Sequence, residues 1–124
     1  MANSHLRVNV KGTQSLPRVL AFRVDGSVVT TSAATTGLLE GTTDATVAKG
    51  SGGASNEVTF TWDEAFARVP VITCTCIGAT VVAHIKSVTA TGCVIETFTA
   101  STGAAADDAD FHMMVHGWDS ANIY

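Results

Sequence analysis

The sequence predicts an all-β fold, an antiparallel β-sandwich or jelly roll of about eight strands. β-Branched Thr and Val recur throughout the chain, and their stiff side chains favour extended backbone. Several short runs alternate between apolar and polar residues with a period of two, as half-buried strands do. No segment carries apolar residues at i, i+3, i+4 and i+7 over ten residues, the pattern of an amphipathic helix.

The length and composition are those of one small domain. A chain of 124 residues can build a single hydrophobic core. The sequence is 46% hydrophobic but only 15% charged, below the quarter or so that is usual for soluble domains. A surface so poor in charge is expected where neighbouring molecules partly cover it. We therefore predict an N-terminal arm or strand over residues 1–17 and one β-sandwich domain over residues 18–124.

The charge distribution argues against two classes of partner. The formal net charge is −4, and the seven Lys and Arg residues are scattered along the chain, so no basic stripe for phosphates is present and we expect no nucleic-acid partner. The N-terminus has no signal-peptide pattern, and no apolar run approaches the eighteen or so residues of a membrane helix. We expect no membrane partner and synthesis in a cytoplasm.

The N-terminal half contains weaker strand patterns than the rest of the chain. Residues 6–11 alternate and predict a short strand or extended arm, which the segment 12–17 interrupts. Residues 20–24 predict a strand that ends at Asp25-Gly26, and this dipeptide predicts a hairpin turn into a second strand over 27–30. Within the Ala-, Thr- and Gly-rich stretch 32–56, only residues 45–48 predict a strand.

The C-terminal half predicts five strands. In the first, Val58, Phe60 and Trp62 share one face and should be buried. A turn over residues 63–66 follows, anchored to the core by Phe66 and Pro70. The remaining strands are predicted at residues 71–77, 81–88, 92–99 and 111–116, the last ending at Gly117-Trp118.

The three cysteines, Cys74, Cys76 and Cys93, predict free thiols. An odd number is not typical of a secreted disulfide framework. Only one residue separates Cys74 from Cys76, whereas paired zinc ligands in a sequence are usually separated by two to four residues. We interpret them as small hydrophobic residues.

Two other clusters suggest metal ligands, but simpler interpretations are favoured. His112 and His116 share a strand face, and His84 lies on another predicted strand, yet four residues of strand separate the first two by about 13 Å. We interpret them as solvent or interface residues. The carboxylates at 107–110 lack the glycine and distal glutamate of a calcium loop and indicate a solvated turn. We expect no metal and no cofactor.

No catalytic motif is present, so the sequence predicts a protein that is not an enzyme. It has no Gly-x-Ser-x-Gly elbow, His-Glu-x-x-His motif or phosphate loop. A polysaccharide-cleaving enzyme would need two carboxylates about 5–10 Å apart. Glu57, Glu96 and Asp119 are candidates that the sequence alone does not place.

Three segments carry a resemblance to a known class of protein. They are VTFTWDEAFARVPVIT from Val58, IKSVTATGCVIETF from Ile85 and DADFHMMVHG from Asp108, and RVLAFRVDGSVV from Arg18 adds to them. Over about two-thirds of its length the chain resembles a structural module of tailed-bacteriophage virion proteins. Cys93 departs from the pattern, because an aromatic residue is expected there.

This resemblance implies a virion component made in the host cytoplasm, and two roles follow. One is a capsid decoration (cement) protein on the capsid surface, a homotrimer whose partner is the major capsid protein. The other is a tail-fibre or tailspike module that binds carbohydrate through Trp118, Tyr124 or Trp62. The compact chain, without a shaft, favours decoration. The interface candidates are Leu6, Val8, Val10, Arg18, His112, His116, Trp118 and Tyr124.

Overall fold

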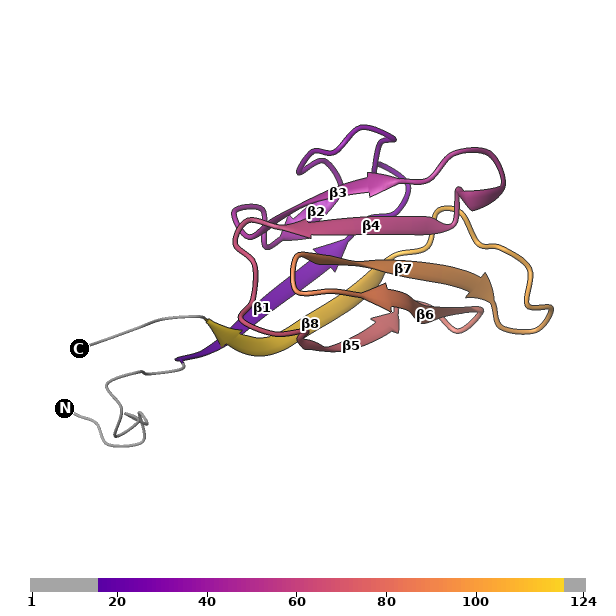
Figure 1. Ribbon diagram of the computed structural model, residues 1–124. Coiled ribbons are helices and arrows are strands. Elements are labelled where there is room, and N and C mark those ends of the chain that lie inside the picture. Colours follow the sequence, from indigo (N-terminus) through magenta and orange to yellow (C-terminus); the bar gives the residue numbers. More distant parts are fainter. Residues whose placement is uncertain (1–15, 120–124) are drawn as a thin grey trace, which may run out of the picture.

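The computed structural model describes residues 16–119 and confirms a β-sandwich of two antiparallel four-stranded sheets (Figure 1). The first sheet has the strand order β2-β1-β8-β5 and the second the order β3-β4-β7-β6. The strands are β1 (Leu16–Val24), β2 (Leu38–Glu40), β3 (Ala45–Lys49), β4 (Glu57–Trp62), β5 (Val71–Cys76), β6 (Val81–Val88), β7 (Gly92–Thr99) and β8 (Phe111–Asp119).

The strands predicted over the C-terminal half are all present as β4 to β8. β5 ends one residue earlier than expected and β8 continues to Asp119. The helical content of the described chain is one 3-10 turn, η1 (Gly52–Ala54). Between residues 16 and 119 the chain therefore offers no helix of the length and apolarity that a bilayer crossing demands.

The pairing of β1 with β8 joins two distant parts of the sequence. Nine residue pairs connect them without a break, from Leu16 opposite Asp119 to Val24 opposite Phe111. Because side chains alternate across a strand, this register sends Phe22 and its partner Met113 into the core, where both are buried. The neighbouring residues on each strand point to solvent.

An aromatic cluster fills the space between the two sheets. Phe22 of the first sheet lies 5.3 Å from Phe60 and 5.9 Å from Trp62 of the second, measured between ring centroids. Phe111 meets Phe60 edge-on at 6.1 Å, and Phe66 meets Trp62 edge-on at 6.1 Å. Such ring pairs add to the stabilisation from burial alone. The predicted burial of Trp62 and the anchoring of the 63–66 turn by Phe66 are both confirmed.

Two residues of the predicted arm segment 1–17 pair with β8 in the first sheet. β1 begins at Leu16, so Leu16 and Pro17, assigned to the arm, belong to the sandwich. Proline suggested a break because it cannot donate a hydrogen bond to a sheet. Here it is tolerated, since β2 pairs only with Arg23 and Val24 and leaves one side of β1 open at Pro17. The rest of the predicted arm lies outside the described residues.

The predicted hairpin at Asp25-Gly26 is wrong. The Asp25 carboxylate accepts hydrogen bonds from the backbone N–H and the hydroxyl of Ser27, so it closes a local turn. Gly26 does not have a positive φ; it is required because a Cβ there would meet the carbonyl of Ala109. The chain then loops to β2, and Leu38 pairs with Val24.

One edge of the second sheet is covered by the loop that precedes β2. Ala34 forms an isolated antiparallel bridge with Val47 of β3. The backbone N–H of Lys49 also donates to the carbonyl of Thr30, at 2.7 Å. The strand predicted at residues 45–48 is therefore confirmed as β3, and part of its outer edge is already hydrogen-bonded.

Gly92 is the position at which the second sheet tolerates no side chain. It opens β7 opposite Thr61, and a Cβ there would lie 2.0 Å from the backbone carbonyl oxygen of Phe60. Backbone cannot move aside as a flexible side chain can, so a substitution must displace β4 or β7.

We expect Gly92→Ala to lower the free energy of unfolding by about 1–3 kcal/mol, the usual cost of overpacking. Gly53→Ala is the matched control, because nothing lies within 4 Å of a Cβ at Gly53. Urea unfolding followed by tryptophan fluorescence measures both. Equal stability of the two variants would contradict the close approach at Gly92.

Candidate interaction surface

The outward side of the first sheet is an exposed surface built by three adjacent strands, β1, β8 and β5. Its residues form cross-strand rows, with Val19, His116 and Val71 in one and Ala21, Met114 and Thr73 in the next. We call this surface the outer face. It comprises Pro17, Val19, Ala21 and Arg23 of β1, His112, Met114, His116 and Trp118 of β8, and Val71, Thr73 and Thr75 of β5.

The outer face is unusually apolar for a solvent-exposed sheet. Four of the nine large hydrophobic side chains that the described residues expose lie on it: Val19 at 52%, Val71 at 68%, Met114 at 44% and Trp118 at 49% exposure. An antiparallel sheet with one solvent-exposed side normally carries polar residues on that side. A grouped apolar surface of this kind is typical of an interaction site.

Three shallow hollows lie on the outer face. The largest, of about 420 Å³, lies over Ala21 and is bounded by Arg23, Glu40, His112 and Met114. A second, of about 230 Å³, lies between Val19, Val71, His116 and Trp118. A third, of about 210 Å³, is lined by Thr73, Thr75, His112 and Met114. The small side chain of Ala21 leaves the first hollow open, because each of its neighbours on this face is longer.

The structure gives Arg18 an internal position. Its side chain is only 14% exposed, and its guanidinium lies 4.4 Å from the ring centroid of Phe66. Arg18 Nη1 donates to the carbonyl oxygen of Glu64 at 2.8 Å and lies 3.4 Å from Asp119 Oδ1. Among the interface candidates, Arg18 therefore ties the 63–66 turn to both terminal strands.

We expect Arg18→Ala to lower the free energy of unfolding by about 1–3 kcal/mol, because it removes a charged hydrogen bond and a cation–π contact. Arg23→Ala, on the outer face, should change it by less than about 0.5 kcal/mol. Thermal unfolding of the two variants makes the comparison. A larger loss for Arg23→Ala would contradict this assignment.

The histidines do not come together. His112 and His116 are both exposed on the outer face, with Met114 between them. His84 lies in β6 of the second sheet, opposite Glu96. Within residues 16–119, no three His, Cys, Asp or Glu side chains are arranged to hold a metal ion.

Two of the three carboxylates at residues 107–110 make contacts within the fold. Asp108 Oδ1 lies 2.8 Å from the ammonium of Lys49. Asp110 Oδ1 accepts a hydrogen bond from the backbone N–H of Gly26 at 3.0 Å. These contacts connect the β7–β8 loop to β3 and to the turn after β1.

Glu57 and Glu96, two candidates for a catalytic pair, lie directly opposite each other on β4 and β7. Lys86 lies between them, with its ammonium 2.8 Å from Glu57 Oε2 and 4.0 Å from Glu96 Oε2. The hydrogen bond to Glu57 raises the pKa of Lys86. Both carboxylates are thus paired with the same ammonium within the fold.

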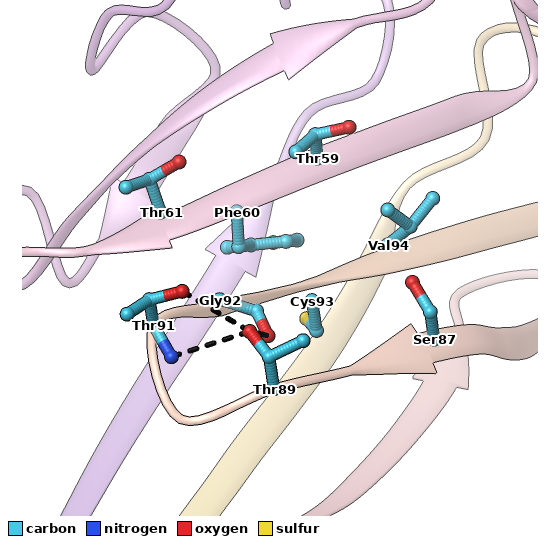
Figure 2. Close-up of a pocket in the computed structure, with 9 residues that line it drawn as sticks. All are labelled: Thr59, Phe60, Thr61, Ser87, Thr89, Thr91, Gly92, Cys93 and Val94. Carbon is cyan, nitrogen blue, oxygen red and sulfur yellow. Dashed lines mark hydrogen bonds between the residues drawn. The ribbon is translucent and has the colours of Figure 1, made fainter. Parts of the chain in front are cut away.

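A hollow on the opposite side of the sandwich is lined by hydroxyl groups, as Figure 2 shows. It has a volume of about 210 Å³ and lies on the second sheet, with Gly92 among its lining residues. Thr89 and Thr91 share a hydrogen bond of 3.1 Å at its rim. The sequence analysis missed it, although the alternation Thr59-Phe-Thr61 already placed hydroxyls on one face. The hydroxyl side chains around it are Thr59, Thr61, Ser87, Thr89 and Thr91.

The two tryptophan candidates for carbohydrate binding, Trp62 and Trp118, differ in their exposure to solvent. Trp62 is 5% exposed and its indole Nε1 has no hydrogen-bond partner within the described chain, so it is a packing residue. Trp118 is half exposed on the outer face. The remaining interface candidates, Leu6, Val8, Val10 and Tyr124, lie outside residues 16–119.

All three cysteines are free and point toward the core. Cys93 is buried, while Cys74 and Cys76 are partly buried against the core on the inward side of β5. Burial raises the pKa of Cys74 and of Cys93 to about 12, and it also raises the pKa of Cys76. Since the thiolate is the reactive form, these thiols should be inert in the folded protein.

We expect the stability of the protein to fall at alkaline pH through these thiols. An unfolded thiol ionises near pH 8.5, whereas folded Cys93 holds its proton to about pH 12. The stabilisation is therefore complete below about pH 8.5 and is lost as the pH rises toward 12, by about 1.4 kcal/mol per pH unit for each buried thiol. Urea unfolding between pH 8 and 10.5 should show a shallower decline for Cys93→Ala, and an identical slope would contradict the burial of Cys93.

Comparison of the chain with protein-family models, with curated proteins and with solved structures finds no match in any of the three.

Proposed function

We propose that this protein is a non-enzymatic bacteriophage capsid decoration protein that binds the major capsid protein and stabilises the mature head. The observation that carries the proposal is the exposed apolar outer face. A surface of this kind costs solubility unless a partner covers it. The resemblance of three segments to phage virion modules supplies the class of partner.

The strand pairing supports the jelly-roll form of the sandwich, which the sequence analysis gives as one of the two expected folds. β1 pairs with β8, β4 pairs with β7, and β5 and β6 are consecutive between them. Pairs nested in this way are expected when one long hairpin folds over into two sheets, as in a jelly roll.

The proposed mechanism is that of a clamp. Each molecule bridges neighbouring capsid subunits on the expanded shell. Because the protein binds only the expanded shell, it stabilises that form of the shell by mass action. We propose a homotrimer at the capsid surface, with the alternating segment 6–10 adding to an exposed edge of a capsid sheet. The chain would be made in the host cytoplasm.

The test is binding of the purified protein to mature shells assembled without it. We expect saturable binding to expanded shells, additional density on the capsid in electron micrographs, and greater resistance of the shell to heat. A deletion of residues 2–12 should weaken binding while the thermal unfolding of the isolated protein stays unchanged. Density on the tail instead of the capsid, or no binding to shells, would overturn the proposal.

The half-exposed indole of Trp118 favours a second candidate, a carbohydrate-binding tail module, because exposed tryptophan stacks on sugar rings. Trp62, buried in the core, does not serve that role. Specific binding on a glycan array that is lost in Trp118→Ala would favour this candidate over decoration.

A further inference from the structure

The outer face combines apolar area with positive charge on a chain whose net charge is negative. None of its eleven positions is Asp or Glu. Arg23 forms no ion pair among residues 16–119. Glu40, opposite Arg23 on β2, is the carboxylate at its margin. An exposed guanidinium without a salt bridge is suited to a carboxylate from outside, which it can bind with two parallel hydrogen bonds.

The hollow over Ala21 lies directly beside this guanidinium. Arg23, His112 and Met114 line it, together with Glu40 at its margin. With a volume of about 420 Å³, it has room for one large apolar side chain. A few large side chains that fill pockets near the centre of an interface carry much of its binding energy.

The charge of the outer face indicates what covers it. Three strands about 4.8 Å apart and about seven residues long give a face of about 300–400 Å². Because each partner contributes about 800 Å² to a stable interface, this face is one part of a larger contact. Arg23 is its charged side chain, so a partner surface that carries carboxylates complements it.

We propose that the outer face binds a segment of the capsid that carries a large apolar side chain beside an Asp or Glu. The apolar side chain enters the hollow over Ala21, and the carboxylate pairs with Arg23. This inference rests on the proposed function and names the chemistry of its contact. It also assigns opposite roles to two arginines five residues apart, since Arg18 holds the fold and Arg23 holds the partner.

The experiment measures binding to mature shells that lack the protein, with two variants on the outer face. Ala21→Phe fills the hollow and Arg23→Glu reverses the charge. Each should weaken binding at least tenfold, and the salt sensitivity of wild-type binding should be lost in Arg23→Glu. Thr59→Phe, which introduces the same side chain on the opposite sheet, and Arg68→Glu, in the exposed loop between β4 and β5, are the controls. Both should bind as the wild type does.

The outcomes separate the two proposals. If the wild type binds shells and both outer-face variants bind equally well, the inference is overturned while the proposed function stands. If the wild type does not bind shells, the proposed function fails and the inference with it. If light scattering shows an oligomer that dissociates in Ala21→Phe, the outer face is a contact between copies, which also overturns the inference. Unchanged circular dichroism and melting temperature establish that each variant is folded.

Discussion

The register between β1 and β8 is the constraint on which both the core and the outer face depend. A shift of one residue would exchange the two sides of each strand, so that Phe22 would face solvent and Val19 would enter the core. Nine consecutive pairs hold this register, and the aromatic contact of Phe22 with Phe60 fixes it from the other sheet. The same pairing therefore buries one set of apolar residues and exposes another.

The two outward sides of the sandwich differ in chemistry. The outer face of the first sheet is apolar, with Arg23 as its fixed charge. The outward side of the second sheet presents threonine hydroxyls and the ion pairs of Lys86 with Glu57 and Glu96. The carboxylates of the second sheet are therefore paired within the fold, whereas Arg23 has no ion pair among residues 16–119 and Met114 is exposed. Under the proposed function, this asymmetry would orient the molecule with its first sheet toward the capsid.

Local alternation was enough to predict most of the fold. The strand containing Phe60 and Trp62 has a single buried side, and period two identifies it without knowledge of its neighbours. The hairpin predicted after Asp25 is wrong because Asp-Gly is compatible with both a hairpin turn and an Asx turn. The hydrogen bond from the backbone N–H of Gly26 to the distant residue Asp110 decides between them. β2 has three residues, too few for a period to show.

The candidate surface was harder to predict than the core. His112, His116 and Trp118 were identified because their residue types are conspicuous. Val19 and Val71 were not, since an exposed valine has no sequence signature, and the two are far apart in the chain. Their proximity follows from β8 lying between β1 and β5, which local patterns do not reveal. The internal role of Arg18 likewise depends on its contact with Phe66, 48 positions away.

The loop that bridges Ala34 to Val47 has a consequence for crowding. A free strand edge invites pairing with another chain, and stacked sheets then grow into fibres. With part of the β3 edge already occupied, the second sheet is hindered from lengthening sideways by adding copies of itself at that side.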